Sequence, residues 1–368
     1  MNISQSRKSY LDNLRAFLII LVIVHHAGQA YGPGGAWPVI DGDPVRWLGT
    51  FFSINAAFFM GLFFFISGYV MPGAYDKYGA GGFLKSKVMR LVIPFAVVSL
   101  GIFLPINYAI GHYTSFDTYI SYLMTGDGIQ SIIAHLWFVQ HLFIYSAVFA
   151  AAVYIKRKIR PRSGSEPSRA DFSPVTLYAA AVVLLVSVAL LSFAVRGEYP
   201  IDRWIVLAGY VRSEPAHLPQ YAIFFILGTL CGRYGILERV RAIDGKLFGA
   251  AALIVIGVRI AGGDRWFHAS PMAYAFIESA LAVTVSGGLL FFIRDYVRMR
   301  TGVSRFFSDN AYGVYLYHVF PMVGIQMAIV GLNIGGNAKF ALVSVLSAAA
   351  SYTAVWLLRL IPAVRKCV

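Results

Sequence analysis

The first apolar stretch of the sequence carries an arginine and a histidine at a spacing that places them on one helix face. Arg15 and His26 are eleven residues apart, which at 100° per residue is only about 20° from three full turns and gives a rise of about 16 Å. Imidazole titrates near neutral pH, so His26 is a candidate general base, with Arg15 stationed along a path toward it. The alternative is that Arg15 only extends to an interface and His26 only bonds a neighbouring helix.

Other apolar stretches carry further polar residues that could work with this pair. His318 lies about ten residues into its stretch, about 15 Å deep, and so matches the depth of His26. Glu278 is another ionisable group in an apolar stretch, and it could orient a histidine or bond a helix neighbour. His135 and Trp137 begin a stretch from the opposite surface. Trp137 could be an interfacial anchor, or it could offer a sugar ring a stacking face beside a polar tip.

The elements that position these residues follow from composition. The 368 residues are 58% hydrophobic with a mean hydropathy of +0.67, and only 13% are charged, against about 25% in a typical soluble domain. We therefore expect an all-α fold, a polytopic membrane bundle of about ten transmembrane helices forming a single domain over 1–368. The expected spans are 14–31, 51–71, 88–110, 133–155, 174–195, 218–235, 246–262, 270–293, 308–331 and 338–360.

The distribution of positive charge sets the orientation of the bundle. With the N-terminus in the cytosol, only seven of the 31 Lys and Arg residues fall on the outer side: Arg46, Arg196, Arg203, Arg212, Arg259, Arg265 and Lys339. Because cytosolic loops are enriched in Lys and Arg, both termini are expected to be cytosolic. The segment 156–173 is basic, rich in Ser and Pro, and predicts a flexible cytosolic loop. The net charge of +14 sits in short clusters between apolar runs, which argues against a nucleic-acid partner.

Small and basic residues follow the second predicted span. Ser67 and Gly68 are small enough to allow close helix approach. Lys85, Lys87 and Arg90 then gather at the cytosolic mouth. These three cations could serve only as topology signals, or they could form a basic collar for phosphates such as those of coenzyme A.

Taken together, these motifs resemble the acyltransferase-3 family of integral membrane O-acyltransferases. The motifs that carry the resemblance, in the family's order, are Asp12-x-x-Arg15 with His26, Phe63-Phe64-x-Ile66-Ser67-Gly68-Tyr69, Lys87-x-x-Arg90-x-x-x-Pro94, His135-Leu136-Trp137-Phe138 and Tyr315-Leu316-x-His318. They cover nearly the whole chain. The resemblance is to the short form of the family, similar to the branch that includes a glucan succinyltransferase.

The resemblance implies an enzyme of the bacterial inner membrane that moves an acyl group from cytosolic acyl-coenzyme A to a glycan or lipid-linked saccharide. It implies that His26 is the catalytic histidine and Arg15 its partner, and we place Asp12 and His318 with them as catalytic candidates. Arg90, Ser67 and Gly68 would belong to the donor side, where we add Lys85 and Lys87.

His135, Trp137 and Glu278 are the candidate substrate-binding residues. No bound cofactor or metal is expected, and acyl-coenzyme A is a donor substrate. The sequence leaves open acetyl against succinyl, direct transfer against an acylated histidine, a contribution of the adjacent His25, and the oligomeric state.

Two other functions use the same buried polar residues. A transporter could move a glycan, a lipid or a proton-coupled solute past them, but the sequence lacks the internal repeat common in secondary transporters. A membrane scaffold or sensor would not require two histidines at matched depth.

Overall fold

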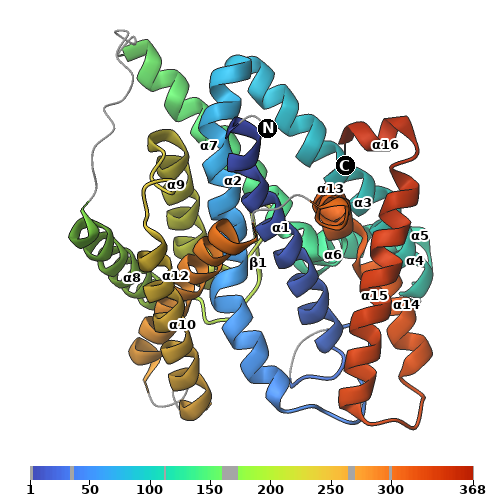
Figure 1. Cartoon of the computed structure of the whole chain (residues 1–368). Helices are drawn as coiled ribbons and strands as arrows, with labels where there is room; N and C mark the ends of the chain where they lie inside the picture. Colours follow the sequence, from blue (N-terminus) through green and yellow to red (C-terminus); the bar gives the residue numbers. More distant parts are fainter. Residues whose placement is uncertain are drawn as a thin grey trace.

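Long apolar helices form the body of the molecule (Figure 1). The computed structural model describes residues 3–33, 37–111, 113–159, 173–263, 270–297 and 301–367. The α-helices are α1 (Ile3–Gly28), α2 (Trp47–Lys87), α3 (Ile93–Val98), α4 (Leu104–Ile110), α5 (Phe116–Leu123), α6 (Gly126–Ile133), α7 (Trp137–Ile159), α8 (Pro174–Arg196), α9 (Leu218–Tyr234), α10 (Ala242–Gly262), α12 (Pro271–Tyr296), α13 (Gly302–Tyr317), α14 (Val319–Ile329), α15 (Gly336–Leu358) and α16 (Pro362–Cys367). The predicted all-α polytopic bundle is confirmed.

Seven stretches of the described residues are long and apolar enough to cross a membrane. They are Ser9–Gly28, Trp47–Ala109, Gly126–Ile159, Pro174–Arg196, Ala242–Gly262, Pro271–Tyr296 and Gly336–Leu358. The second of them contains two predicted spans, because the chain leaves helical geometry at Gly79 (φ 67°, ψ 177°) and then runs back at an angle to α2, so that α3 lies near α13 (Figure 1). The predicted span 218–235 corresponds to α9, which has 17 residues.

The predicted span 308–331 is divided into two helices that meet at His318. Figure 1 shows α13 down its axis and α14 from the side, so the two helices run in different directions. Pro321 accounts for the break, because it has no N–H to donate to the carbonyl of Tyr317, four residues earlier, and its ring clashes with that carbonyl. A histidine is thereby placed at a helix junction inside the bundle.

Prolines also shape the segment that follows α2. Two π-helical turns, η1 (Val88–Val92) and η2 (Ser99–Phe103), flank α3. Pro94 leaves the carbonyl of Arg90 without its helical partner, and the hydroxyl of Tyr312 in α13 donates to that carbonyl at 2.5 Å. Single π-turns are frequent at functional sites, and η1 carries Arg90.

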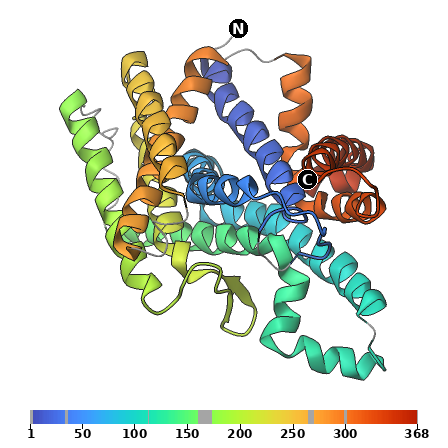
Figure 2. The ribbon, with the colours of Figure 1, turned by 90° about the horizontal axis from the view of Figure 1, so that it is seen from below.

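A short turn and a hairpin lie beside the start of α7. The 3₁₀ turn η3 (Ala134–Leu136) joins α6 to α7, and Ala134 takes a positive φ of 46°. Strands β1 (Ile205–Leu207) and β2 (Val211–Ser213) pair antiparallel. They lie against α6 and α7 (Figure 2), and the 3₁₀ turn η4 (Pro215–His217) leads from the hairpin to α9.

Close helix packing explains the glycines of the α2–α9 interface. A Cβ on Gly68 would overlap the carbonyl oxygen of Phe225, and one on Gly228 would overlap that of Phe65. Without side chains at these positions the two backbones approach closely, which is the main source of helix association in lipid. The prediction that Gly68 permits close approach is confirmed.

Both chain ends lie toward the same end of the molecule (Figure 1). The predicted loop 156–173 falls mainly on residues 160–172, which, like Arg265, lie outside the described residues. The single-domain organisation stays a prediction.

Candidate active site

The structure brings His26 and His318 into direct contact across a sequence separation of 292 residues. Nδ1 of His26 lies 2.8 Å from Nε2 of His318, and the two rings are parallel to within 6° with centroids 5.1 Å apart. His26 comes from the last turns of α1 and His318 from the α13–α14 junction. The two histidines that the sequence places at one depth therefore form a hydrogen-bonded pair.

The hydrogen bonds of His318 assign the proton positions of the pair. Nδ1 of His318 lies 2.8 Å from the carbonyl oxygen of Tyr315 and 3.1 Å from that of Val314. Carbonyls only accept, so this nitrogen carries the hydrogen, and with neutral rings Nε2 of His318 is an acceptor. Nδ1–H of His26 must then donate to His318. This leaves the lone pair of His26 on Nε2.

Only one ring of the pair, that of His26, is accessible from outside the bundle core. His318 is fully buried (0% exposed), whereas His26 is partly exposed. Among the described residues, Nε2 of His26 has no hydrogen-bond partner. The basic nitrogen of the pair is thus the one that an incoming molecule can reach.

His135 is a third imidazole of the same cluster. Its ring centroid lies 4.9 Å from that of His318 and 6.5 Å from that of His26. Nε2 of His135 donates to the carbonyls of Tyr315 and Leu316 at 3.0 and 3.2 Å, and the hydroxyl of Tyr315 donates to the carbonyl of His135. Nδ1 of His135 is buried without a partner, so it offers a second acceptor lone pair.

Trp37 completes the surroundings of His26, and it was not among the site residues predicted from the sequence. Its ring stacks on that of His26 at 5.4 Å and 22°. Its Nε1–H donates to Oε1 of Gln326 at 2.8 Å, and Nε2 of Gln326 donates to the carbonyl of Ala27 at 3.2 Å. Trp37 lies in the connection after the first span, where no periodicity marks its direction. The only sequence signal is a large aromatic residue in a short Gly- and Pro-rich segment.

His25 faces a different part of the bundle. Its ring packs on Phe52 and Phe59 of α2, at centroid distances of 4.9 and 5.1 Å. Its Nε2 lies 3.2 Å from Nε2 of Gln29. No hydrogen bond joins it to His318 within the part of the chain that the structure describes. The geometry therefore favours His26 over His25 as the reactive ring.

Basic residues gather about three helical turns from His26, near the middle of α1. Arg15 pairs with Asp12 at 3.3 Å, and both side chains are about one-third exposed (34% and 30%). The charges of Arg90 and Arg15 both act on Lys87, so these three cations share one region. Lys85 and Arg90 are exposed there. The structure thus groups Arg15 with the predicted donor-side cations.

The small residues predicted for the donor side lie deeper in the bundle. Gly68 is buried against the backbone of α9, and Ser67 is only partly exposed. Close packing accounts for Gly68 fully. A role of either residue in binding the donor stays a prediction.

An aromatic wall extends outward from the histidine cluster. Trp137 stacks on Tyr221 at 5.5 Å and 25°, and it meets the ring of Trp204 edge-on at 5.5 Å. The guanidinium of Arg212 lies 4.4 Å over Trp204. Trp204 and Arg212 come from the hairpin segment after α8, and no spacing in the sequence relates them to Trp137. Such a wall of indole faces suits a sugar ring.

Glu278 belongs to a separate buried network. Its Oε1 lies 3.0 Å from Nε2 of His217, its other oxygen pairs with Arg196, and Nδ1 of His217 lies 2.9 Å from Oε2 of Glu214. Burial opposes the charge on His217, but the two carboxylates outweigh it and raise the pKa of His217 to about 10. Tyr221, stacked on His217 at 5.9 Å, connects this network to the aromatic wall. Glu278 thus orients a histidine, but not His26 or His318.

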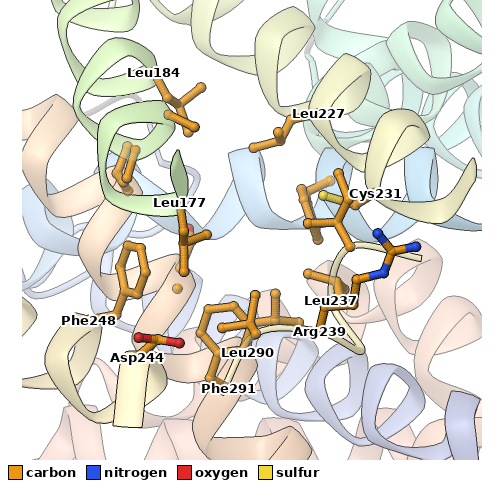
Figure 3. A pocket seen from close by; sticks show the side chains of 18 of the residues that line it. Leu177, Leu184, Leu227, Cys231, Leu237, Arg239, Asp244, Phe248, Leu290 and Phe291 are labelled. Atoms are coloured by element: carbon orange, nitrogen blue, oxygen red, sulfur yellow. The ribbon is translucent and has the colours of Figure 1, made fainter. Parts of the chain in front are cut away.

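The structure also contains an apolar cavity of about 290 Å³ among α2, α8, α9, α10 and α12 (Figure 3). Leu177, Leu184, Leu227 and Phe291 line it, and Arg239 and Asp244 stand at its edge. None of the clustered histidines contributes to it. Within the described residues, no group of three or more His, Cys, Asp or Glu side chains is arranged to hold a metal ion.

Comparison with known proteins identifies the family. Residues 8–359 match the family described as "Acyltransferase domain". Among curated relatives, "Glucans biosynthesis protein C" of Escherichia coli O1:K1 / APEC is 25% identical over 322 residues, covering 85% of this chain and 81% of the relative. The protein of the same name from Escherichia coli strain SMS-3-5 is 24% identical with the same coverage. No solved structure matches. The chain belongs to the acyltransferase-3 family and is a membrane O-acyltransferase.

Proposed function

We propose that this O-acyltransferase moves an acetyl or succinyl group from cytosolic acyl-coenzyme A to a hydroxyl of a glycan or lipid-linked saccharide on the other side of the membrane. The observation that carries the proposal is the hydrogen bond from Nδ1 of His26 to Nε2 of His318, which leaves Nε2 of His26 basic and partly exposed. A saccharide hydroxyl is a poor nucleophile at neutral pH, so a base at this position supplies what the reaction needs.

The donor binds at the basic residues around Arg15 of α1. Arg15, Lys87 and Arg90 share one region there, and Lys85 adds an exposed cation. Guanidinium and ammonium groups form charge-assisted hydrogen bonds with phosphate oxygens. The thioester would then reach inward along α1 toward His26, about three helical turns beyond Arg15.

In direct transfer, Nε2 of His26 takes the proton of the saccharide hydroxyl. The saccharide oxygen forms a bond to the thioester carbonyl carbon, the carbon–sulfur bond breaks, and the departing thiolate receives the proton from His26. While His26 is an imidazolium, its Nδ1–H donates to the lone pair of His318, which stabilises the charge. The backbone carbonyls at Nδ1 of His318 keep that lone pair directed at His26.

In a relay, Nε2 of His26 itself attacks the carbonyl carbon, and the thiolate leaves with a proton from solvent. The saccharide hydroxyl then attacks the acylated imidazole and releases its proton to solvent as the carbon–nitrogen bond breaks, which restores neutral His26. His318 can hold the Nδ1 proton of His26 during the acylated stage. Both routes use the same pair of rings.

The acceptor would approach from the end that carries η3 and the hairpin. His135 there presents an unpartnered Nδ1, and Trp137 belongs to the aromatic wall. We place this end outside the bacterial inner membrane and both termini in the cytosol, because the basic clusters gather at the end that carries the termini.

Sealed membrane vesicles of both orientations test this scheme. Labelled acyl-coenzyme A added to inside-out vesicles should be consumed and should mark a glycan, whereas right-side-out vesicles should leave it unused. A transporter would move solute without consuming the donor. Consumption from the outer face only, or glycan movement without acyl transfer, would overturn the proposal.

A further inference from the structure

Arg212 is a fixed cation near the histidine cluster. Its backbone N–H donates to Oε1 of Gln140 at 3.2 Å, and its carbonyl accepts from Nε2 of His141 at 3.1 Å. Both partners belong to α7, so these two hydrogen bonds hold strand β2 against the helix that directly follows η3. The position of Arg212 is therefore set by the fold.

The guanidinium of Arg212 lacks a matching anion. One face lies over Trp204, and Nη1 donates to the carbonyl of Ala134 at 2.5 Å. Its Nε is buried with no partner, and no carboxylate within the described residues forms an ion pair with it. The nearby Glu214 is already engaged by His217 and by the backbone N–H of Asp202. A buried donor left unpaired is costly, which favours an anionic ligand at this place.

The guanidinium keeps its charge in this environment. Burial lowers the pKa of Arg212 to about 10, and the charge of Glu214 opposes that shift. Arg212 therefore remains a cation at neutral pH.

Arg212 is also coupled to the histidine cluster. It binds the carbonyl of Ala134, the residue before His135, and its charge acts on the ring of His135. The donor-side cations Arg15 and Lys87 lie about three helical turns from His26 along α1. A thioester that enters past these cations, with its carbonyl carbon at Nε2 of His26, would place the far end of its acyl group among the residues around His26, which include His135 beside Arg212.

We propose that Arg212 binds the free carboxylate of a dicarboxylic acyl group such as succinyl, and so selects succinyl over acetyl. This inference rests on the proposed function. Acetyl ends one methyl group beyond the carbonyl carbon and has no charge to offer Arg212. Succinyl continues through two methylene groups to a carboxylate, for which the planar guanidinium is the best matched partner among the side chains.

Competition between succinyl- and acetyl-coenzyme A in inside-out vesicles tests this selection. The wild-type protein should transfer mainly succinyl, measured by mass spectrometry of the glycan. Arg212→Gln should lower the ratio of succinyl to acetyl transfer roughly 10- to 100-fold, the usual worth of a hydrogen-bonded charge. Arg212→Lys keeps the charge but lacks the planar guanidinium, so its ratio should lie between those of the wild-type protein and Arg212→Gln.

The matched control is Arg203→Gln. Arg203 is an exposed cation of the same outer segment that donates to the carbonyl of Glu198, and its loss should leave the ratio unchanged. The ratio does not depend on how much protein folds, because both donors meet the same preparation.

Three outcomes would contradict the inference. The first is a wild-type preference for acetyl, the second an equal loss of both transfers in Arg212→Gln, and the third an equal shift of the ratio in Arg203→Gln. Each would show that Arg212 does not bind the acyl carboxylate. Consumption of neither donor by the wild-type protein would overturn the proposed function, and this selection with it.

Discussion

Nδ1 of His26 and Nε2 of His318 lie 2.8 Å apart, and the far nitrogen of His318 faces two backbone carbonyls. A ring held in this way can only accept at Nε2 while it is neutral. His318 therefore acts on the reaction through His26, as a positioning residue.

Replacement of His318 should reduce turnover with little effect on donor binding. We expect His318→Ala to lower kcat about 100-fold, the lower range for loss of acid–base assistance, with the KM for acyl-coenzyme A nearly unchanged. His318→Gln should recover part of the rate, because its amide can accept from His26 and donate to the carbonyl of Tyr315. Equal rates in the Ala and Gln variants would show that no such acceptor is needed.

Trp37 should matter through its ring more than through its N–H. Trp37→Phe keeps an aromatic face on His26 but loses the bond to Gln326, and it should retain most of the activity. Trp37→Ala removes the stack, and we expect kcat to fall about 10-fold as His26 loses its fixed orientation. Steady-state kinetics in vesicles distinguishes the two variants. Full activity of Trp37→Ala would exclude a positioning role.

The basic residues at the donor end should set affinity for the phosphates of coenzyme A. Lys87→Gln and Arg90→Gln should each raise the KM for acyl-coenzyme A about 10-fold, because each removes a charge-assisted hydrogen bond. The KM for an acyl-pantetheine, which lacks those phosphates, should not change. Lys77→Gln, at an exposed lysine of α2, is the control. A similar rise for both donors would place these cations elsewhere in the mechanism.

Gly68 should be needed for packing. A Cβ at Gly68 meets the backbone of α9, so Gly68→Ala should destabilise the detergent-solubilised protein by about 1–3 kcal/mol. Gly73, on the same helix, has open space at its Cβ position, and Gly73→Ala should change stability by less than about 0.5 kcal/mol. Equal thermal midpoints for the two variants would contradict the close approach of α2 and α9.

The His217 network predicts how stability depends on pH. The folded pKa of about 10 lies above the ordinary value of 6.5, so the stabilisation from protonated His217 is complete below about pH 6.5. It is lost as the pH rises through about 10. The thermal midpoint should fall over this window, and His217→Gln should flatten the fall. An unchanged slope in the variant would exclude His217 as its source.

Most of the helical bundle and the pairing of His26 with His318 could be predicted from the sequence. Hydropathy indicates the spans. The position of His26 in the first span and of His318 in a later one places the two rings at the same depth. The break at His318 was not predicted, although Pro321 signals it, because Pro is often tolerated within membrane helices. Trp37 and Arg212 lie in connecting segments. Their positions depend on tertiary contacts with Gln326 and Gln140, which no periodicity reveals.

For Glu278, the sequence predicts burial but not the partners. Its burial in an apolar span could be predicted, but its partners His217 and Arg196 come from segments whose approach depends on the packing of α8, α9 and α12. Charge and depth alone do not distinguish a buried glutamate near the reaction from one that only joins helices of the bundle.

A comparison of His26→Ala with His25→Ala at matched membrane levels, by the rate of acyl transfer from coenzyme A to glycan, measures which ring carries out the reaction. If Nε2 of His26 is the reactive atom, His26→Ala should lose at least about 100-fold in transfer rate, and His25→Ala should retain most of it. Wild-type transfer by His26→Ala would show that this ring is not the base.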